Sequence, residues 1–219
     1  MKLKYLLWTV FGIAAVSIGF YPLLYYLVDM SQGLFSGKSA ELLADRVWHT
    51  AFYMHITFGG IAMLIGWTQF SRNIRNTRLN LHRTLGKIYV FSVMLSSIAG
   101  FYIAQFASGG IVSRVGFSLL AISWFFSVTK AYATILKKHF KQHENWMIRN
   151  YALTFAAVTL RIYLPFSTQL MHWDFITSYV AISWLCWVPN VIVAQIIISK
   201  RALIPAFATK PKTTDYFQD

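Results

Sequence analysis

The sequence predicts an all-α protein that crosses a membrane several times and forms a single domain. Of its 219 residues, 57% are hydrophobic and 17% are aromatic, against about 45–50% apolar residues in soluble domains, and the mean hydropathy is +0.51. A transmembrane helix needs about 20 mostly apolar residues, and six stretches provide them. We expect six helices, a four-helix core made by the second to fifth of them and a cytoplasmic tail over 199–219, the helices spanning 5–28, 50–70, 85–107, 115–136, 151–171 and 176–198.

The first predicted helix follows Lys2 and Lys4, an arrangement that is also seen in secretory signals. Its apolar run is longer than the core of such a signal, and no small-residue cleavage site precedes a mature region. We therefore interpret it as a retained helix. The connections between the six segments are too short to hold a separate globular domain.

Basic residues are concentrated at alternate ends of the predicted helices. The opposite ends hold only Lys38, Arg46 and Arg114, together with acidic residues. By the positive-inside rule this pattern places both termini in the cytoplasm. The excess charge favours contact with anionic lipid, and it gives no support to nucleic-acid binding. The basic ends hold fifteen of the twenty lysines and arginines: Lys2, Lys4, Arg72, Arg75, Arg78, Arg83, Lys87, Lys137, Lys138, Lys141, Arg149, Lys200, Arg201, Lys210 and Lys212.

The second predicted helix carries a histidine beside a column of small residues. His55, Gly59, Ala62 and Gly66 fall on one stripe at helical spacing. One interpretation is close helix packing through Ala62 and Gly66, which is common in membranes. The other is a slot for the flat ring of a porphyrin or a quinone, with His55 as its ligand or hydrogen-bond donor.

The third and fifth predicted helices each have a histidine at the cytoplasmic end. His82 precedes the third, and His143 shares a face with Arg161 if the fifth begins several residues early. Two histidines on alternate helices suit axial ligation of one cofactor between them, with Arg83 and Arg149 placed to hold its carboxylates. The alternative is that both histidines are interfacial residues in contact with lipid phosphates or water.

Arg161 lies near the middle of the fifth predicted helix, and none of the six segments contains an Asp or Glu. A charged residue at that depth costs a few kcal/mol and faces a protein interior or a water-filled cavity. We expect Arg161 to share a pocket in the outer half of the bundle with His55, close to Gln105 or Gln169. The alternative is that its long side chain extends to an interface and only assists packing.

The fourth and sixth predicted helices offer no further site. Lys130 is close enough to the cytoplasmic end to extend out of the membrane, and His139 is surrounded by lysines, which favours a solvated loop. Cys186 is the only cysteine, so the chain has no intrachain disulfide and no thiolate metal motif. No phosphate-binding loop, Ser-His-Asp order or HExxH pattern is present.

Three blocks resemble a bacterial family that is known only as predicted membrane proteins with a domain of unknown function. They are HITFGGIAMLIGWTQ from His55, HRTLGKIY from His82 and HENWMIRNYALTFAAVTLR from His143. The resemblance covers about residues 50–165. More loosely, the layout is similar to that of membrane b-type cytochromes and ferric reductases, which implies haem held between histidines on alternate helices. The fourth segment has no histidine to pair with His55, so only one of the two haem sites of those proteins can form.

The leading expectation is a b-haem redox protein, with His82 and His143 as axial ligands and Arg83 and Arg149 beside the propionates. The competing class is a non-enzymatic carrier or assembly factor that handles a metal, a haem or an anionic lipid in a cavity between His55 and Arg161. A structural membrane subunit is a third possibility. The sequence leaves open whether the protein is an enzyme.

Overall fold

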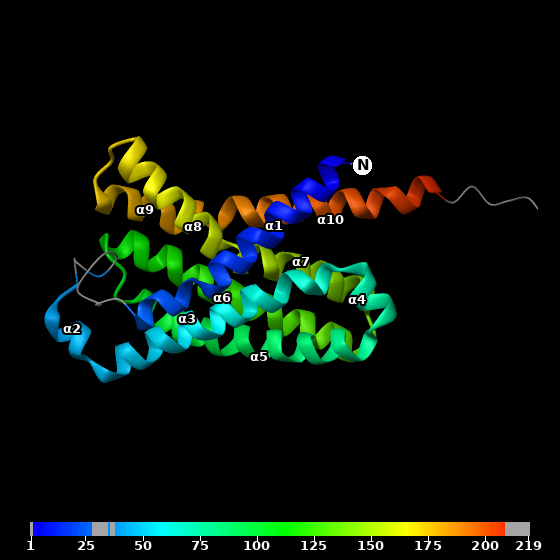
Figure 1. Cartoon of the computed structure of the whole chain (residues 1–219), viewed down its shortest axis with the longest axis horizontal. Coiled ribbons are helices and arrows are strands. Elements are labelled where there is room, and N and C mark those ends of the chain that lie inside the picture. Colours follow the sequence, from blue (N-terminus) through cyan, green and yellow to red (C-terminus); the bar gives the residue numbers. More distant parts are fainter. Residues whose placement is uncertain (1, 28–34, 36–37, 209–219) are drawn as a thin grey trace, which may run out of the picture.

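The protein is a bundle of helices, and about 89% of the described residues are helical. The computed structural model describes residues 2–27, 35 and 38–208, and it contains no strand among them. Figure 1 shows an elongated bundle with the short helix α2 (Ala40–Ala44) at one end and α4 (Arg72–Thr77) at the other. The first residues of α1 (Lys2–Phe20) and the last of α10 (Val188–Ala208) both lie toward the α4 end.

Five helices are long and apolar enough to cross a membrane within the part of the chain that the structure describes. Their spans are Tyr5–Tyr26, Arg46–Phe70, Leu79–Ala104, Gly110–Leu136 and Phe175–Arg201. They correspond to five of the six predicted segments. In helix labels they are α1 with η1 (Tyr21–Tyr26), α3 (Arg46–Gly66) with η3 (Trp67–Phe70), α5 (Leu79–Ala104), α6 (Gly110–Leu136), and α9 (Phe175–Leu185) with most of α10.

The remaining predicted segment, 151–171, is an interrupted helix. It is divided between α7 (Phe140–Thr154), α8 (Ala156–Pro165) and the π-helix η4 (Phe166–Leu170). At the break, the carbonyl oxygen of Phe155 accepts hydrogen bonds from the amides of both Val158 and Thr159, so the turn tightens locally. The early start of α7 places His143 inside a helix, but the break at Phe155 separates it from Arg161, which lies in α8.

Helix ends differ from the predicted boundaries where polar caps extend the helices. The Asp45 carboxylate accepts hydrogen bonds from the amides of Val47 and Trp48, so α3 begins four residues before the predicted start at residue 50. At the C-terminal end, α10 continues to Ala208. The predicted last helix ended at residue 198, so the helix continues through 199–208 into the segment that was predicted as a tail. Val28 and residues 209–219 lie outside the described residues.

The core is made by four helices, in agreement with the predicted arrangement. Helix α3 packs on α5, α5 on α6, and α6 on α7, while α1, α9 and α10 lie on the outside of this set. Gly66 has no side chain at the point where the Tyr89 and Tyr151 rings approach α3. The small residue thus serves helix packing, and tyrosine rings fill the space beside it. The core side chains include Met63, Tyr89, Val93, Trp124, Val128, Met147 and Tyr151.

Candidate functional site

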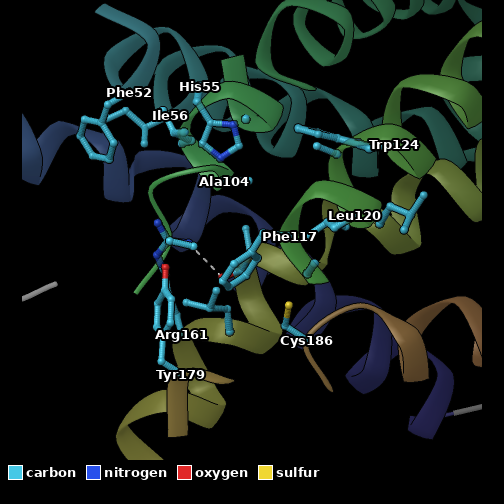
Figure 2. A pocket seen from close by; sticks show the side chains of 18 of the residues that line it. Phe52, His55, Ile56, Ala104, Phe117, Leu120, Trp124, Arg161, Tyr179 and Cys186 are labelled. Atoms are coloured by element: carbon cyan, nitrogen blue, oxygen red, sulfur yellow. Dashed lines mark hydrogen bonds between the residues drawn. The ribbon is translucent and has the colours of Figure 1, made fainter. Parts of the chain in front are cut away.

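A cavity of about 250 Å³ lies inside the bundle, in the half that is nearer to α2. Residues of α3, α5, α6, α8 and α9 line it, and most of them are apolar (Figure 2). The polar exceptions are few, and they include His55, Arg161 and Lys38. A mainly apolar wall with a few polar groups is the usual composition of a small-molecule site.

His55 is fixed by Ser96 on the neighbouring helix α5. Its Nδ1 lies 2.9 Å from the Ser96 carbonyl oxygen, and the Ser96 hydroxyl donates to the His55 carbonyl oxygen at 2.7 Å. A carbonyl only accepts hydrogen bonds, so Nδ1 carries the proton. Gly100 permits this position, because a Cβ there would stand 2.8 Å from Nδ1. In the neutral ring, Nε2 is therefore left as an acceptor at the cavity.

Arg161 projects from α8 into the same cavity. Its Nη1 donates to the carbonyl oxygen of Ala157 at 3.0 Å, and the guanidinium carbon lies 4.4 Å from the centre of the Tyr21 ring. Its Nε is buried and has no hydrogen-bond partner among the described residues. A guanidinium offers five N–H donors, so most of its hydrogen-bonding capacity is not used by the protein. Figure 2 shows His55 and Arg161 approaching the cavity from different sides.

Lys38 is a second cation at this cavity. From the sequence it was only one of the few basic residues at the outer ends of the predicted helices. Its Nζ donates a hydrogen bond to the carbonyl oxygen of Phe106. Burial, together with the positive charge of Arg114, lowers the pKa of Lys38 below the usual lysine value. Gln105 and Gln169 do not line the cavity, and Gln105 donates to the Ser118 hydroxyl.

A buried polar network lies next to the cavity and joins three core helices. The Asn150 amide donates to the Trp124 carbonyl oxygen at 2.9 Å and to the Ser127 hydroxyl at 2.8 Å, while Asn150 Oδ1 accepts from the Tyr89 hydroxyl. The Trp124 indole N–H donates to the Thr154 hydroxyl at 2.9 Å. At helical spacing, Asn150 and Thr154 lie on the same face as His143, and their polarity inside or beside an apolar segment is the signal in the sequence.

His82 and His143 lie away from the cavity, near the first turns of α5 and α7. His143 Nδ1 lies 2.8 Å from the carbonyl oxygen of Ala131 and therefore donates to it, which leaves Nε2 free. His82 Nδ1 is buried without a hydrogen-bond partner among the described residues. No cluster of three or more His, Cys, Asp or Glu side chains that suits a metal ion occurs in the described part of the chain.

The two arginines predicted beside those histidines differ in their surroundings. Arg149 donates to the Gln195 side-chain oxygen at 2.9 and 3.2 Å, and its guanidinium lies over the Trp146 ring. Arg83 is exposed. Near His143 in the sequence, the Glu144 carboxylate forms ion pairs with Arg201 at 2.9 Å and with Arg75 at 3.6 Å.

The chain matches one protein family over residues 52–198, more than half of its length. The description of that family is "Predicted membrane protein (DUF2306)". No curated protein and no solved structure is significantly similar to the chain. On the strength of this match and of its apolar helices, the protein belongs to the DUF2306 family of predicted membrane proteins.

Proposed function

We propose that this membrane protein is a carrier or binding protein that holds a small, largely apolar molecule in the cavity between His55 and Arg161. The observation that carries the proposal is the cavity itself: an apolar wall with a histidine acceptor and an arginine donor aimed into it. Its volume of about 250 Å³ is slightly below the ~300–1,000 Å³ of drug-sized sites. A quinone ring or the head of an anionic lipid belongs to the size class that this space accepts.

The test is chemical analysis of what the protein carries out of the membrane. Ala121 lines the cavity on α6, and Ala121→Phe would fill part of it. Ala133→Phe, on the exposed side of the same helix, is the matched control. We expect solvent extracts of the purified wild type and of Ala133→Phe to contain a molecule that is depleted in Ala121→Phe, with thermal unfolding used to show that all three are folded. Equal extracts from all three proteins would contradict the proposal.

A second candidate function is binding of b-haem between His82 and His143. The first support is the His143 ring, which donates through Nδ1 and keeps Nε2 available, as in histidines that ligate metals. The second is the Nδ1 atom of His82, which is buried without a hydrogen-bond partner among the described residues. Both residues lie on helices of the four-helix core. Haem would supply one-electron chemistry, and Arg83 and Arg149 would lie on the side of its carboxylates.

The haem candidate is tested by the absorption spectrum of the purified protein. A bis-histidine haem gives a low-spin spectrum that is lost when either ligand is removed. His82→Ala and His143→Ala should each abolish it, and His139→Ala should retain it. A wild-type spectrum in either of the first two variants, or a colourless wild-type protein grown with sufficient iron and haem precursor, would contradict this candidate.

We further propose that the protein lies in the bacterial inner membrane with both termini in the cytoplasm. The support is the segregation of basic residues toward the α4 end of the bundle. This orientation places the cavity in the outer half of the membrane.

A further inference from the structure

The charges at the cavity are unbalanced. Arg161 and Lys38 both line it, and Arg114 is close enough to Lys38 to act on its protonation. Glu41 and Asp45, the acidic residues nearest in sequence to Lys38, are exposed, and the Asp45 carboxylate is occupied by the first amides of α3. Among the described residues, the ion pairs involve Glu144 at the other end of the bundle. No described carboxylate therefore neutralises the two cations.

The unmet hydrogen-bonding capacity lies at the same place. Arg161 uses one nitrogen on the Ala157 carbonyl and covers the Tyr21 ring with one face, and its buried Nε meets no partner among the residues that the structure describes. An ammonium group has three N–H donors, and one of those on Lys38 is directed to the Phe106 carbonyl. Buried charges in proteins are normally paired. Both side chains line the same cavity, and each offers donors that a carboxylate or phosphate accepts.

We infer that the cavity selects a ligand with one anionic head, a carboxylate or a phosphate monoester, held by Arg161 and Lys38, with an apolar body that extends along Phe117 and Leu120 toward Trp124. This inference rests on the proposed binding function and specifies its ligand class. An apolar body is required because the rest of the wall offers carbon atoms. A head without charge would leave both cations uncompensated in a site of low dielectric constant.

Two probes that differ only in the head test the inference. The probes are 6-bromohexanoic acid and 6-bromohexan-1-ol, since bromine quenches tryptophan fluorescence at short range and Trp48 and Trp124 line the cavity. The protein is placed in nanodiscs of phosphatidylcholine, which carries no net charge. We expect saturable quenching by the acid at concentrations at least about tenfold lower than for the alcohol, equivalent to about 1.4 kcal/mol. Trp48→Phe, which removes an indole N–H without a hydrogen-bond partner, should reduce the quenched fraction.

Charge variants identify the groups responsible. Arg161→Gln and Lys38→Gln should each weaken acid binding about tenfold or more without changing that of the alcohol, and Arg161→Lys should restore part of the loss. Arg46→Gln is the control, because Arg46 is exposed and lies outside the cavity. If Arg161→Gln does not fold, Lys38→Gln still tests whether a cation at the cavity binds the acid, because Lys38 is only half-buried.

The outcomes separate the inference from the function on which it rests. Equal binding of acid and alcohol, lost for both in Ala121→Phe, would overturn the anionic head and leave the binding function standing. Absence of saturable quenching by either probe would overturn both. When the acid does bind, competition by phosphatidic acid in the nanodisc, whose head is a phosphate monoester, identifies a lipid head as the anion, and lack of competition identifies a free acid.

Discussion

The Nδ1 atom of His55 lies 2.9 Å from the carbonyl oxygen of Ser96, and this contact fixes both the ring and its tautomer. The space for it comes from Gly100, one turn further along α5, where a Cβ would stand 2.8 Å from Nδ1 and 3.0 Å from Cε1. The position of the histidine at the cavity therefore depends on a residue that contributes no side chain.

Gly100→Ala should displace the His55 ring and break its hydrogen bond to Ser96. Overpacking of this kind costs about 1–3 kcal/mol, and the variant should also lose affinity for the brominated acid. Gly86→Ala is the control on the same helix, since its Cβ would meet only Gln69 Oε1 at 3.6 Å, an ordinary contact. The free energies of unfolding of both variants in the same detergent check the prediction. A Gly100 variant as stable as the Gly86 variant would contradict it.

Asn150→Leu should destabilise the protein by about 1–3 kcal/mol, because it removes the buried hydrogen bonds that Asn150 makes with the Tyr89 and Ser127 hydroxyls and with the Trp124 carbonyl. Asn145→Leu, on the same helix, removes an asparagine for which the described residues show no side-chain hydrogen bond. Chemical unfolding of the two variants gives the comparison. Equal stability would show that the network contributes no net free energy.

Asp174→Ala should lower the thermal unfolding midpoint at neutral pH, because the carboxylate caps α9 through the amides of Ile176 and Thr177. Hydrogen bonding to the Thr177 side chain and to these amides lowers the pKa of Asp174 below its usual value. A carboxylate with a lowered pKa in the folded state stabilises the fold above its unfolded pKa, and this contribution is lost as pH falls through the folded pKa. The difference between wild type and variant should therefore shrink below about pH 4. Asp174→Asn, which still caps, should remove that pH dependence.

Binding of 6-bromohexanoic acid should weaken as the pH is raised through the pKa of Lys38. Burial and Arg114 lower that pKa, so Lys38 loses its charge at a pH where most lysines keep theirs, and the cavity then loses one of its two cations. Lys38→Arg should keep affinity constant across this range, because arginine stays protonated. The measurement is the quenching titration repeated between pH 7 and pH 10. An unchanged decline in the arginine variant would assign the pH dependence to another group.

A reporter enzyme that is active only outside the cytoplasm should be inactive when fused after Asp219 and active when fused after Ser108. The expectation follows from the distribution of basic residues. The turn at Gly109, which has φ +85°, precedes α6, and the nearby Ala107 lines the cavity. Activity of the first fusion would reverse the proposed orientation.

The helical architecture was predictable because its signal is long and redundant, whereas the helix ends depend on single residues. A run of about 20 apolar residues tolerates many substitutions, but the start of α3 is set by one carboxylate, Asp45. The break at Phe155 was not predictable, since Tyr151 to Leu164 reads as one continuous apolar helix. The continuation of α10 beyond residue 199 was missed because Lys200 and Arg201 resemble the end of a membrane segment.

The candidate site was predictable only as far as depth along a helix determines it. Counting residues from the predicted helix ends indicated that the side chains of His55 and Arg161 could reach the same depth in the membrane, and both residues line one cavity. Lys38 could not be placed there from the sequence, because it lies outside the helices and reaches the cavity through a contact with Phe106 that is distant in the chain. The contacts of Asn150 likewise depend on how three helices are rotated against one another, which spacing along a single helix does not define.

The hydrogen bonds of Thr154 make the two ends of the cavity different. Its hydroxyl donates to the Asn150 carbonyl and receives the Trp124 indole N–H, and the Tyr89 hydroxyl is within 3.0 Å. The single proton of this hydroxyl is thus already in use, and this end of the cavity has none to give to a guest. Among the described residues, unused protons at the cavity lie on Arg161, seven residues further along the chain, on Lys38 and on the Trp48 indole. A polar ligand therefore has one low-energy orientation in the cavity instead of two. The reversed orientation would leave the charges of Arg161 and Lys38 without a partner.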